Sequence, residues 1–287
     1  MENNNTVATL SELIDDYHIH AELFSIEQLK QIESVMSFIS NHALMIKRAV
    51  DRTGKGFSDY YLQNNTLVVV PEMRHSEVLC RMEFLAGYSE EFVTTVVKPV
   101  QTYLEHLVRA DLNLFKDKCN FKNPGGGAFP PHQDAPAYQG FGPDCFVTIA
   151  IFLDEATEEN GCLYFAKNWS AQLKTDSSVR GSVGGSSLIL PHYQGGEKNG
   201  VIREECSDRL AWQPVYAKAG DAIVFDSFAP HFSKPNHSSG TRRALFLTFN
   251  LASEGDLYRS YYEQKWRNFG DPKFHVATPT EHDTRLD

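Results

Sequence analysis

The first clear hydrophobic periodicity in the chain follows Ser25. Apolar residues recur there at steps of three and four: Ile26, Leu29, Ile32, Val35, Met36 and Ile39. This spacing predicts an amphipathic helix with one buried face. Ser25 and Gln28 fit a capping box, so we expect the helix to begin directly after Ser25.

A second helical region is expected over residues 90–114. Its apolar stripe consists of Phe92, Val96, Val100, Leu104 and Leu107. Pro99 lies inside this stripe, and a proline removes a helical hydrogen bond, so a kink or a restarted helix is expected there. An aromatic segment over residues 257–269 predicts another helix.

Most of the chain after residue 115 shows short segments rich in β-branched and aromatic residues. Strands are expected there at residues 115–121, 145–153, 163–166, 187–190, 222–225 and 244–251. One further strand is expected earlier in the chain, at residues 66–70. Loops rich in Gly, Asn, Asp and Ser separate them, which favours a sandwich or barrel over a parallel βαβ sheet. The connection over residues 169–211 is long, and such loops are often lids or binding loops.

The chain shows no linker, internal repeat or low-complexity tract. We therefore expect a single domain over residues 1–287, with a helical part at about 1–114, a β-rich core at about 115–251 and a helical segment at about 252–287. The 287 residues are 41% apolar and 22% charged, which is ordinary for a globular protein. The net charge of -10 disfavours nucleic acid and anionic membranes as partners.

The cysteines and the first residues indicate the compartment. Five cysteines form an odd set without a CxxC pair, which argues against a disulfide framework and a structural zinc site. Neither a signal-peptide pattern nor an apolar stretch of about 20 residues occurs, so we expect a cytoplasmic protein without a membrane span.

Candidate metal ligands occur in two remote parts of the chain. His132 and Asp134 are two residues apart, so on an extended segment their side chains point the same way. His231 follows a turn and an apolar strand. Two imidazoles and one carboxylate suit an iron(II) oxygenase, because they leave coordination positions open. Arg242, eleven residues further on, heads the last expected strand, and its planar fork suits a dicarboxylate. Each element alone is weak, but their order and spacing together are specific.

These motifs and their surroundings resemble the phytanoyl-CoA dioxygenase-like family. The resemblance covers about residues 115–251. Besides the metal motifs and Arg242, the matching positions in this range are Asn120-Phe121-Lys122, 152–157, 159–163, Gly220-Asp221 and Ser233. One departure is visible at residues 167–170, where many family members have a Gly-Ser-His triplet. This departure concerns local substrate contacts and not the metal site.

The resemblance implies a mainly β protein with flanking helices, whose core is a double-stranded β-helix, that is, a cupin-like jelly roll. It implies Fe(II), 2-oxoglutarate and O2 as cofactors, with His132, Asp134 and His231 as metal ligands. Arg242 would bind the distal carboxylate of 2-oxoglutarate. Further cosubstrate contacts would come from Ser233, Thr148, Asn120 and Lys118. Asp134 favours hydroxylation over halogenation, because related halogenases replace this carboxylate with a small residue.

Within the family the chain looks most like bacterial hydroxylases of small aminophosphonates. This implies a role in phosphonate catabolism, with 2-aminoethylphosphonate or 2-(trimethylamino)ethylphosphonate as the substrate. The aromatic residues Phe129, Tyr138 and Phe141, and Tyr60 and Tyr61 in an expected early loop, could bind a quaternary ammonium. Packing is the alternative role for each of them. Three basic residues of the long loop could meet an anionic head or could be surface charges: Lys174, Arg180 and Arg203.

Three other interpretations stay open at this point. The substrate could be another small zwitterion or an acyl compound. A cupin-like metal enzyme that is not an oxygenase, such as an isomerase, would not need Arg242 at its position. A non-catalytic jelly-roll binding module would not need the metal motifs at all. A small molecule is the expected binding partner, and a homo-oligomer is compatible with the sequence.

Overall fold

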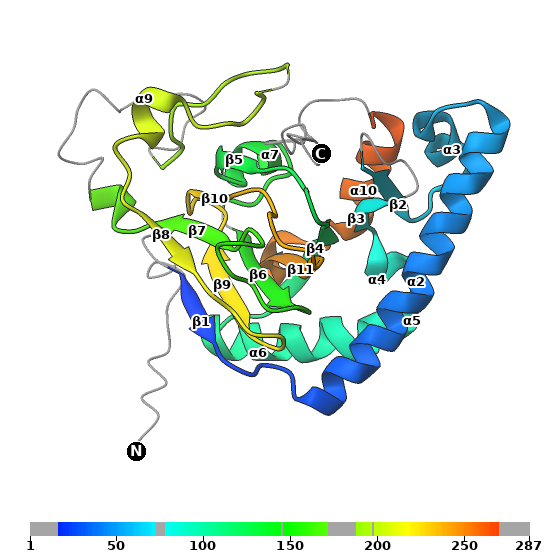
Figure 1. Ribbon diagram of the computed structural model, residues 1–287, viewed down its shortest axis with the longest axis horizontal. Helices are drawn as coiled ribbons and strands as arrows, with labels where there is room; N and C mark the ends of the chain where they lie inside the picture. Colours follow the sequence, from blue (N-terminus) through cyan, green and yellow to red (C-terminus); the bar gives the residue numbers. More distant parts are fainter. Residues whose placement is uncertain (1–16, 73–77, 145, 172–187, 197, 270–287) are drawn as a thin grey trace.

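The computed structural model describes residues 17–72, 78–144, 146–171, 188–196 and 198–269, and two antiparallel sheets lie at its centre (Figure 1). The larger sheet has the order β1-β9-β6-β11-β4-β3-β2 and the smaller one β5-β10-β7-β8. The strands of the larger sheet are β1 (His18–His20), β2 (Val68–Pro71), β3 (Leu79–Glu83), β4 (Leu112–Lys122), β6 (Phe146–Phe152), β9 (Ala222–Asp226) and β11 (Arg242–Leu251). Those of the smaller sheet are β5 (Phe129–His132), β7 (Leu163–Ala166), β8 (Trp212–Val215) and β10 (His231–Ser233).

The two sheets pack face to face, which confirms the predicted jelly roll. Alternate residues of β6, β9 and β11 form an apolar cluster with β7 and β8, among them Phe152, Phe225, Phe246, Leu163 and Phe165. We call this side of the larger sheet its inner face. On β4 the inner face carries Lys116, Lys118, Asn120 and Lys122, because these residues pair directly with Thr248, Phe246, Ala244 and Arg242 of β11.

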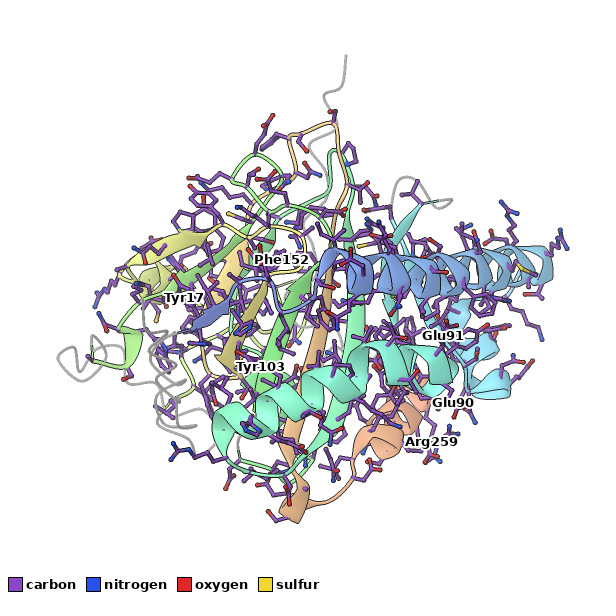
Figure 2. The ribbon with its side chains drawn as sticks, turned by 90° about the horizontal axis from the view of Figure 1, so that it is seen from below. Tyr17, Glu90, Glu91, Tyr103, Phe152 and Arg259 are labelled. Atoms are coloured by element: carbon purple, nitrogen blue, oxygen red, sulfur yellow. The ribbon has the colours of Figure 1, made fainter. Side chains whose placement is uncertain are left out.

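Helices cover the outer face of the larger sheet (Figure 2). Helix α2 (Ile26–Thr53) and helix α6 (Lys98–Val108) pack with the outer residues of β6, β9 and β11 in the largest apolar cluster. The capping box is confirmed, since Ser25 Oγ accepts from the backbone of Gln28 and the Gln28 side chain accepts from Ser25. The helix continues 14 residues beyond Ile39, the last position of the predicted stripe. Cys119 also lies on this outer face, as the alternation with Lys118 and Asn120 predicts.

The second helical region begins as expected but is divided and shorter. It consists of α5 (Glu90–Phe92), a π-helical turn η1 (Val93–Val97) and α6. The π turn directly precedes Pro99, which cannot donate a backbone hydrogen bond. The helix ends at Val108, and Arg109 adopts a left-handed conformation with φ 56°. The prediction that it reaches residue 114 is therefore wrong, because residues 112–114 already belong to β4.

Other expectations need correction. Residues 188–190 form no strand, and Ser187 lies outside the described residues. Tyr60 and Tyr61 lie in helix α3 (Phe57–Asn64) and not in a loop. Strands β1, β3, β5, β8 and β10 were not expected, because they have only three to five residues and two of them contain proline. The remaining helices are α4 (Leu85–Tyr88), α7 (Ala135–Tyr138), α9 (Glu204–Ser207), η3 (Ala252–Glu254) and α10 (Tyr258–Arg267), the last of which confirms the predicted aromatic helix. Across the described ranges, no helix combines the length and the apolarity that a membrane crossing requires.

Helix α10 is attached to the sheet by a buried ion pair. Lys265 Nζ lies 2.6 Å from Glu83 Oε2, and both side chains are almost fully buried. Arg81 Nε lies 2.9 Å from the other carboxylate oxygen of Glu83. Burial lowers the pKa of Lys265 to about 7, although Glu83 opposes this shift. The pair therefore depends on close contact between α10 and β3.

We expect Lys265→Met to destabilise the fold by about 3–5 kcal/mol, because breaking a buried ion pair leaves the partner charge poorly compensated. The measurement is the free energy of unfolding in urea. Arg259→Met on the same helix is the matched control, since Arg259 lies 3.1 Å from Glu263 in an exposed pair (Figure 2). Such pairs contribute about 0–1 kcal/mol. Equal losses in the two variants would contradict this account.

Candidate metal centre and cosubstrate pocket

The pairing of β5 with β10 brings two remote histidines together. His132 and His231 are register partners, and their ring centroids lie 4.2 Å apart. One ligand atom each from His132, Asp134 and His231 lies within 4.8 Å of the others, and all three residues are buried. A short antiparallel pairing therefore brings together two histidines that lie about 100 residues apart in the sequence. The predicted triad converges.

The orientation of the two imidazole rings is set by backbone carbonyls. His132 Nδ1 lies 2.7 Å from Pro130 O, and His231 Nδ1 lies 3.0 Å from Ala229 O. A carbonyl can only accept, so each Nδ1 carries the proton and each Nε2 keeps a free lone pair. Hydrogen bonds of this kind fix the tautomer of ligating histidines in metal sites.

The charges of the triad are those that a divalent metal requires. Burial, together with the neighbouring His231, lowers the pKa of His132 to about 3. Burial also lowers the pKa of His231. For Asp134 burial would raise the pKa, but Lys118 and the two histidines outweigh it and lower the pKa to about 2. At neutral pH two neutral imidazoles and one carboxylate are present, which are the ligating forms.

Asp134 does not continue the extended strand that the H-x-D spacing suggested. Strand β5 ends at His132, and Asp134 is the N-terminal cap of α7 with φ -76° and ψ -30°. The intervening Gln133, which no sequence pattern singled out, anchors this turn. Its Nε2 donates to Leu188 O and Phe228 O, and its Oε1 accepts from Leu190 N. Residues 188–190 are thereby attached to the segment that carries His132 and Asp134.

Arg242 carries a buried guanidinium that has no carboxylate partner among the described residues. Its side chain is 2% exposed, Nη2 donates to Gly161 O at 2.8 Å, and Nε has no hydrogen-bond partner among the described residues. Burial lowers its pKa to about 10, so it is still charged at neutral pH. The neighbouring Arg243 points to the other face and binds Asp154 and Glu33. Arg242 thus retains donor capacity for an anion.

A cavity lies between Arg242 and the two histidines of the triad. Its lining consists of Lys118, Asn120, Phe129, His132, Leu163, His231, Phe232, Ser233, Arg242 and Phe246. The predicted cosubstrate residues Lys118, Asn120, Ser233 and Arg242 all belong to it. Asn120 Oδ1 is buried and has no partner in the described part of the chain. Thr148 is not among these residues, and its hydroxyl lies 3.0 Å from that of Thr248.

Lys122 is a functional candidate that sequence reasoning missed. Its Nζ donates to Ser233 Oγ at 2.8 Å and to Lys234 O at 2.5 Å, so it positions the Ser233 hydroxyl beside the cavity. Burial and the nearby Arg242 lower the pKa of Lys122 well below its usual value. The period-two spacing of Lys118, Asn120 and Lys122 is the signal that could have identified it.

The predicted substrate residues are brought together only in part. Tyr138 and Phe141 both contact Phe115, with ring centroids 5.2 and 5.3 Å away. Tyr61 is fully buried, and its hydroxyl exchanges hydrogen bonds with the backbone of Val69. Neither these residues nor Tyr60 occurs among the described residues that line the cavity. Lys174 and Arg180 lie outside the described residues, and Arg203 is exposed, 3.9 Å from Glu205.

The donor set and the unpartnered polar atoms fit the cofactors that the sequence implied. Two imidazole nitrogens and one carboxylate oxygen are a ligand set typical of non-haem iron(II). The unpaired Arg242 Nε and Asn120 Oδ1 border the same cavity, where they can hold a polar ligand. Fold and site together describe a jelly-roll protein with a buried cluster of two histidines and one carboxylate that could hold a metal ion.

The chain belongs to the phytanoyl-CoA dioxygenase family (PhyH), whose model matches residues 72–244. It is 43% identical over 156 residues to a methylphosphonate hydroxylase from Gimesia maris, covering 54% of this chain and 52% of that protein. It is 32% identical over 193 residues to a 2-aminoethylphosphonate dioxygenase from an uncultured bacterium, covering 67% and 66%. The matches thus span between half and two thirds of these relatives.

Solved structures share the fold. The structure of EctD from S. alaskensis with 2-oxoglutarate and 5-hydroxyectoine superposes with a TM-score of 0.58 at 16% identity, covering 88% of this chain and 80% of that one. EvdO2 from Micromonospora carbonacea var. aurantiaca, complexed with 2-oxoglutarate, gives a TM-score of 0.57 at 17% identity, covering 82% and 86%. The likeness confirms the jelly-roll architecture.

Proposed function

We propose that this protein is an Fe(II)- and 2-oxoglutarate-dependent dioxygenase that hydroxylates a C–H bond of a small phosphonate. The observation that carries the proposal is the buried triad of His132, Asp134 and His231 beside a guanidinium, that of Arg242, with an unpartnered Nε. A metal ion bound by three protein groups has coordination positions left for a chelating cosubstrate and oxygen.

Each residue has a defined task in this proposal. His132, Asp134 and His231 would hold Fe(II), which together with 2-oxoglutarate and O2 supplies the oxidising chemistry. Arg242 would bind the distal carboxylate of 2-oxoglutarate, with the Ser233 hydroxyl beside it. Asn120 and Lys118 would contact the cosubstrate from β4. The apolar walls of Phe129, Leu163, Phe232 and Phe246 would exclude water from the cavity.

The substrate class rests on the relatives and on local charge. Two relatives that cover more than half of this chain are named for phosphonate substrates, methylphosphonate and 2-aminoethylphosphonate. The inner face of β4 adds three lysines near the metal site, although the chain as a whole carries a net charge of -10. An anionic substrate is therefore favoured electrostatically at this site.

The test is a substrate screen scored by succinate release. Purified protein receives Fe(II), ascorbate and 2-oxoglutarate, and then methylphosphonate, 2-aminoethylphosphonate or 2-(trimethylamino)ethylphosphonate. We expect at least one phosphonate to raise succinate above the substrate-free background and to yield a hydroxylated product. Metal binding without succinate formation under any condition would favour a cupin-like enzyme that is not an oxygenase. Stimulation only by betaines or acyl thioesters would overturn the phosphonate assignment.

A further inference from the structure

Lys116 is a cation of the inner face that the proposed cosubstrate site does not use. It lies on β4 opposite Thr248 and is half-buried. Its Nζ lies 5.5 Å from the ring centroid of Tyr138 and 5.5 Å from that of Tyr261. The ammonium is therefore placed between two aromatic rings, one from α7 and one from α10.

The described residues give Lys116 no hydrogen bond and no ion pair. Glu83 is close enough to interact with it electrostatically, but its carboxylate oxygens are already paired with Lys265 at 2.6 Å and Arg81 at 2.9 Å. A half-buried ammonium that faces two rings and makes no hydrogen bond among the described residues loses hydration that a carboxylate would normally replace. An anion bound to the Lys116 ammonium would replace this lost hydration.

Lys116 lies within electrostatic range of Asp134, one of the three candidate metal ligands. Lys118 and Lys116 are among the charges that lower the pKa of Asp134, and Tyr138 ends the short helix that Asp134 begins. Tyr138 itself is held in place by a hydrogen bond to Thr248 and by its burial. An anion bound at Lys116 would therefore lie beside the metal ligands.

The same anion cannot serve Lys116 and Arg242. Lys122 of β4 is the register partner of Arg242 on β11. Lys116 lies on β4, six residues before Lys122. An extended chain rises about 3.3 Å per residue, so the Cα atoms of Lys116 and Lys122 are about 20 Å apart. The inner face thus offers two anion sites on the paired strands β4 and β11, Lys116 at one end and Arg242 at the other, with Lys118 and Asn120 between them. 2-Oxoglutarate would use the Arg242 end.

We propose that Lys116, held between Tyr138 and Tyr261, binds the phosphonate group of the substrate; this rests on the proposed function. The ammonium would donate charge-assisted hydrogen bonds to the phosphonate oxygens, while the carbon substituent is directed toward the metal. The ring faces of Tyr138 and Tyr261 are already occupied by Lys116. They therefore orient a cation of the protein and do not receive the ammonium group of an aminophosphonate.

The experiment measures binding of methylphosphonate and 2-aminoethylphosphonate by calorimetry. The protein is loaded with Fe(II) and 2-oxoglutarate and kept without oxygen, so that no turnover is needed. Lys116→Met removes the charge and keeps the aliphatic stem, and Lys116→Arg restores a cation. Lys218→Met, at an exposed lysine, is the control. The affinity of each variant for 2-oxoglutarate is measured in parallel and also reports that the protein is folded.

We expect Lys116→Met to weaken phosphonate binding by about 10- to 100-fold, the effect of one charge-assisted hydrogen bond. Binding of 2-oxoglutarate should stay unchanged, and Lys116→Arg should recover part of the loss. Unchanged phosphonate affinity in Lys116→Met, or an equal loss for 2-oxoglutarate, would overturn the inference. If the wild type binds phosphonates through Lys116 but never forms succinate, the proposed oxygenase function fails while the phosphonate site stands. If the wild type releases succinate but binds no phosphonate, the Lys116 site and the phosphonate assignment both fail, while the 2-oxoglutarate-dependent activity stands.

Discussion

Asp134→Ala is expected to abolish succinate formation from 2-oxoglutarate, and His132→Ala is expected to do the same. Each change removes one of three buried ligand groups, and Asp134 is the only anion among them. Loss of residues that merely support metal ligands already lowers affinity or activity by about 10- to 100-fold, so loss of a ligand should exceed this range. The measurements are succinate release and the iron that remains bound after desalting.

Asp144→Ala is the matched control for this prediction. Asp144 is an exposed acid ten residues further along the chain, so its removal changes net charge by the same amount without touching the site. Its iron content and succinate release should equal those of the wild type. Full turnover in both Asp134→Ala and His132→Ala would exclude the triad as the metal centre.

Arg242→Met is expected to raise the concentration of 2-oxoglutarate needed for half-maximal succinate formation by about 100-fold. A charge-assisted hydrogen bond contributes about 1.5–3 kcal/mol, and each 1.4 kcal/mol corresponds to about a factor of ten. Methionine keeps an unbranched side chain in the buried space, so the loss reports mainly the guanidinium. Because Arg242 has no ion pair among the described residues, its removal leaves no unpaired acid behind.

The neighbouring Arg243 supplies the control for Arg242. It is bound to Asp154 and Glu33 at 2.7 Å on the opposite face of β11. Arg243→Met should lower the free energy of unfolding and leave the requirement for 2-oxoglutarate unchanged. If the two substitutions raised this requirement equally, Arg242 would not be the carboxylate-binding residue.

Several elements follow from local sequence because their causes are local. The capping box at Ser25 and the stripe after it define the start of α2, and the long β-branched run defines β6. Strands of only three to five residues could not be predicted from local sequence. Strands β5 and β10 carry His132 and His231, yet their own residues contain no periodicity long enough to identify them. Only pairing with each other, and of β10 with β7, makes them strands.

The substrate side was the least predictable part of the site. Tyr60 and Tyr61 were expected in a loop, but both lie in helix α3. There Tyr61 packs against Phe57, and its hydroxyl donates a hydrogen bond to Val69 O. Aromatic side chains serve equally well in a core and in a pocket, so composition cannot assign them. The contact of Lys116 with Tyr138 and Tyr261 depends on where α10 crosses β4, which no local pattern encodes.

The sequence by itself determined the kinds of ligand atoms, their order along the chain and the guanidinium that follows them. These features are chemical and local, so the residues alone specify them. The tertiary structure decided the rest: which histidine nitrogens remain free, which buried cations have no acidic partner among the described residues, and that Lys116 and Arg242 lie at opposite ends of the paired strands β4 and β11. Burial and cross-strand pairing between remote segments set these properties, and neither is contained in any single stretch of the chain.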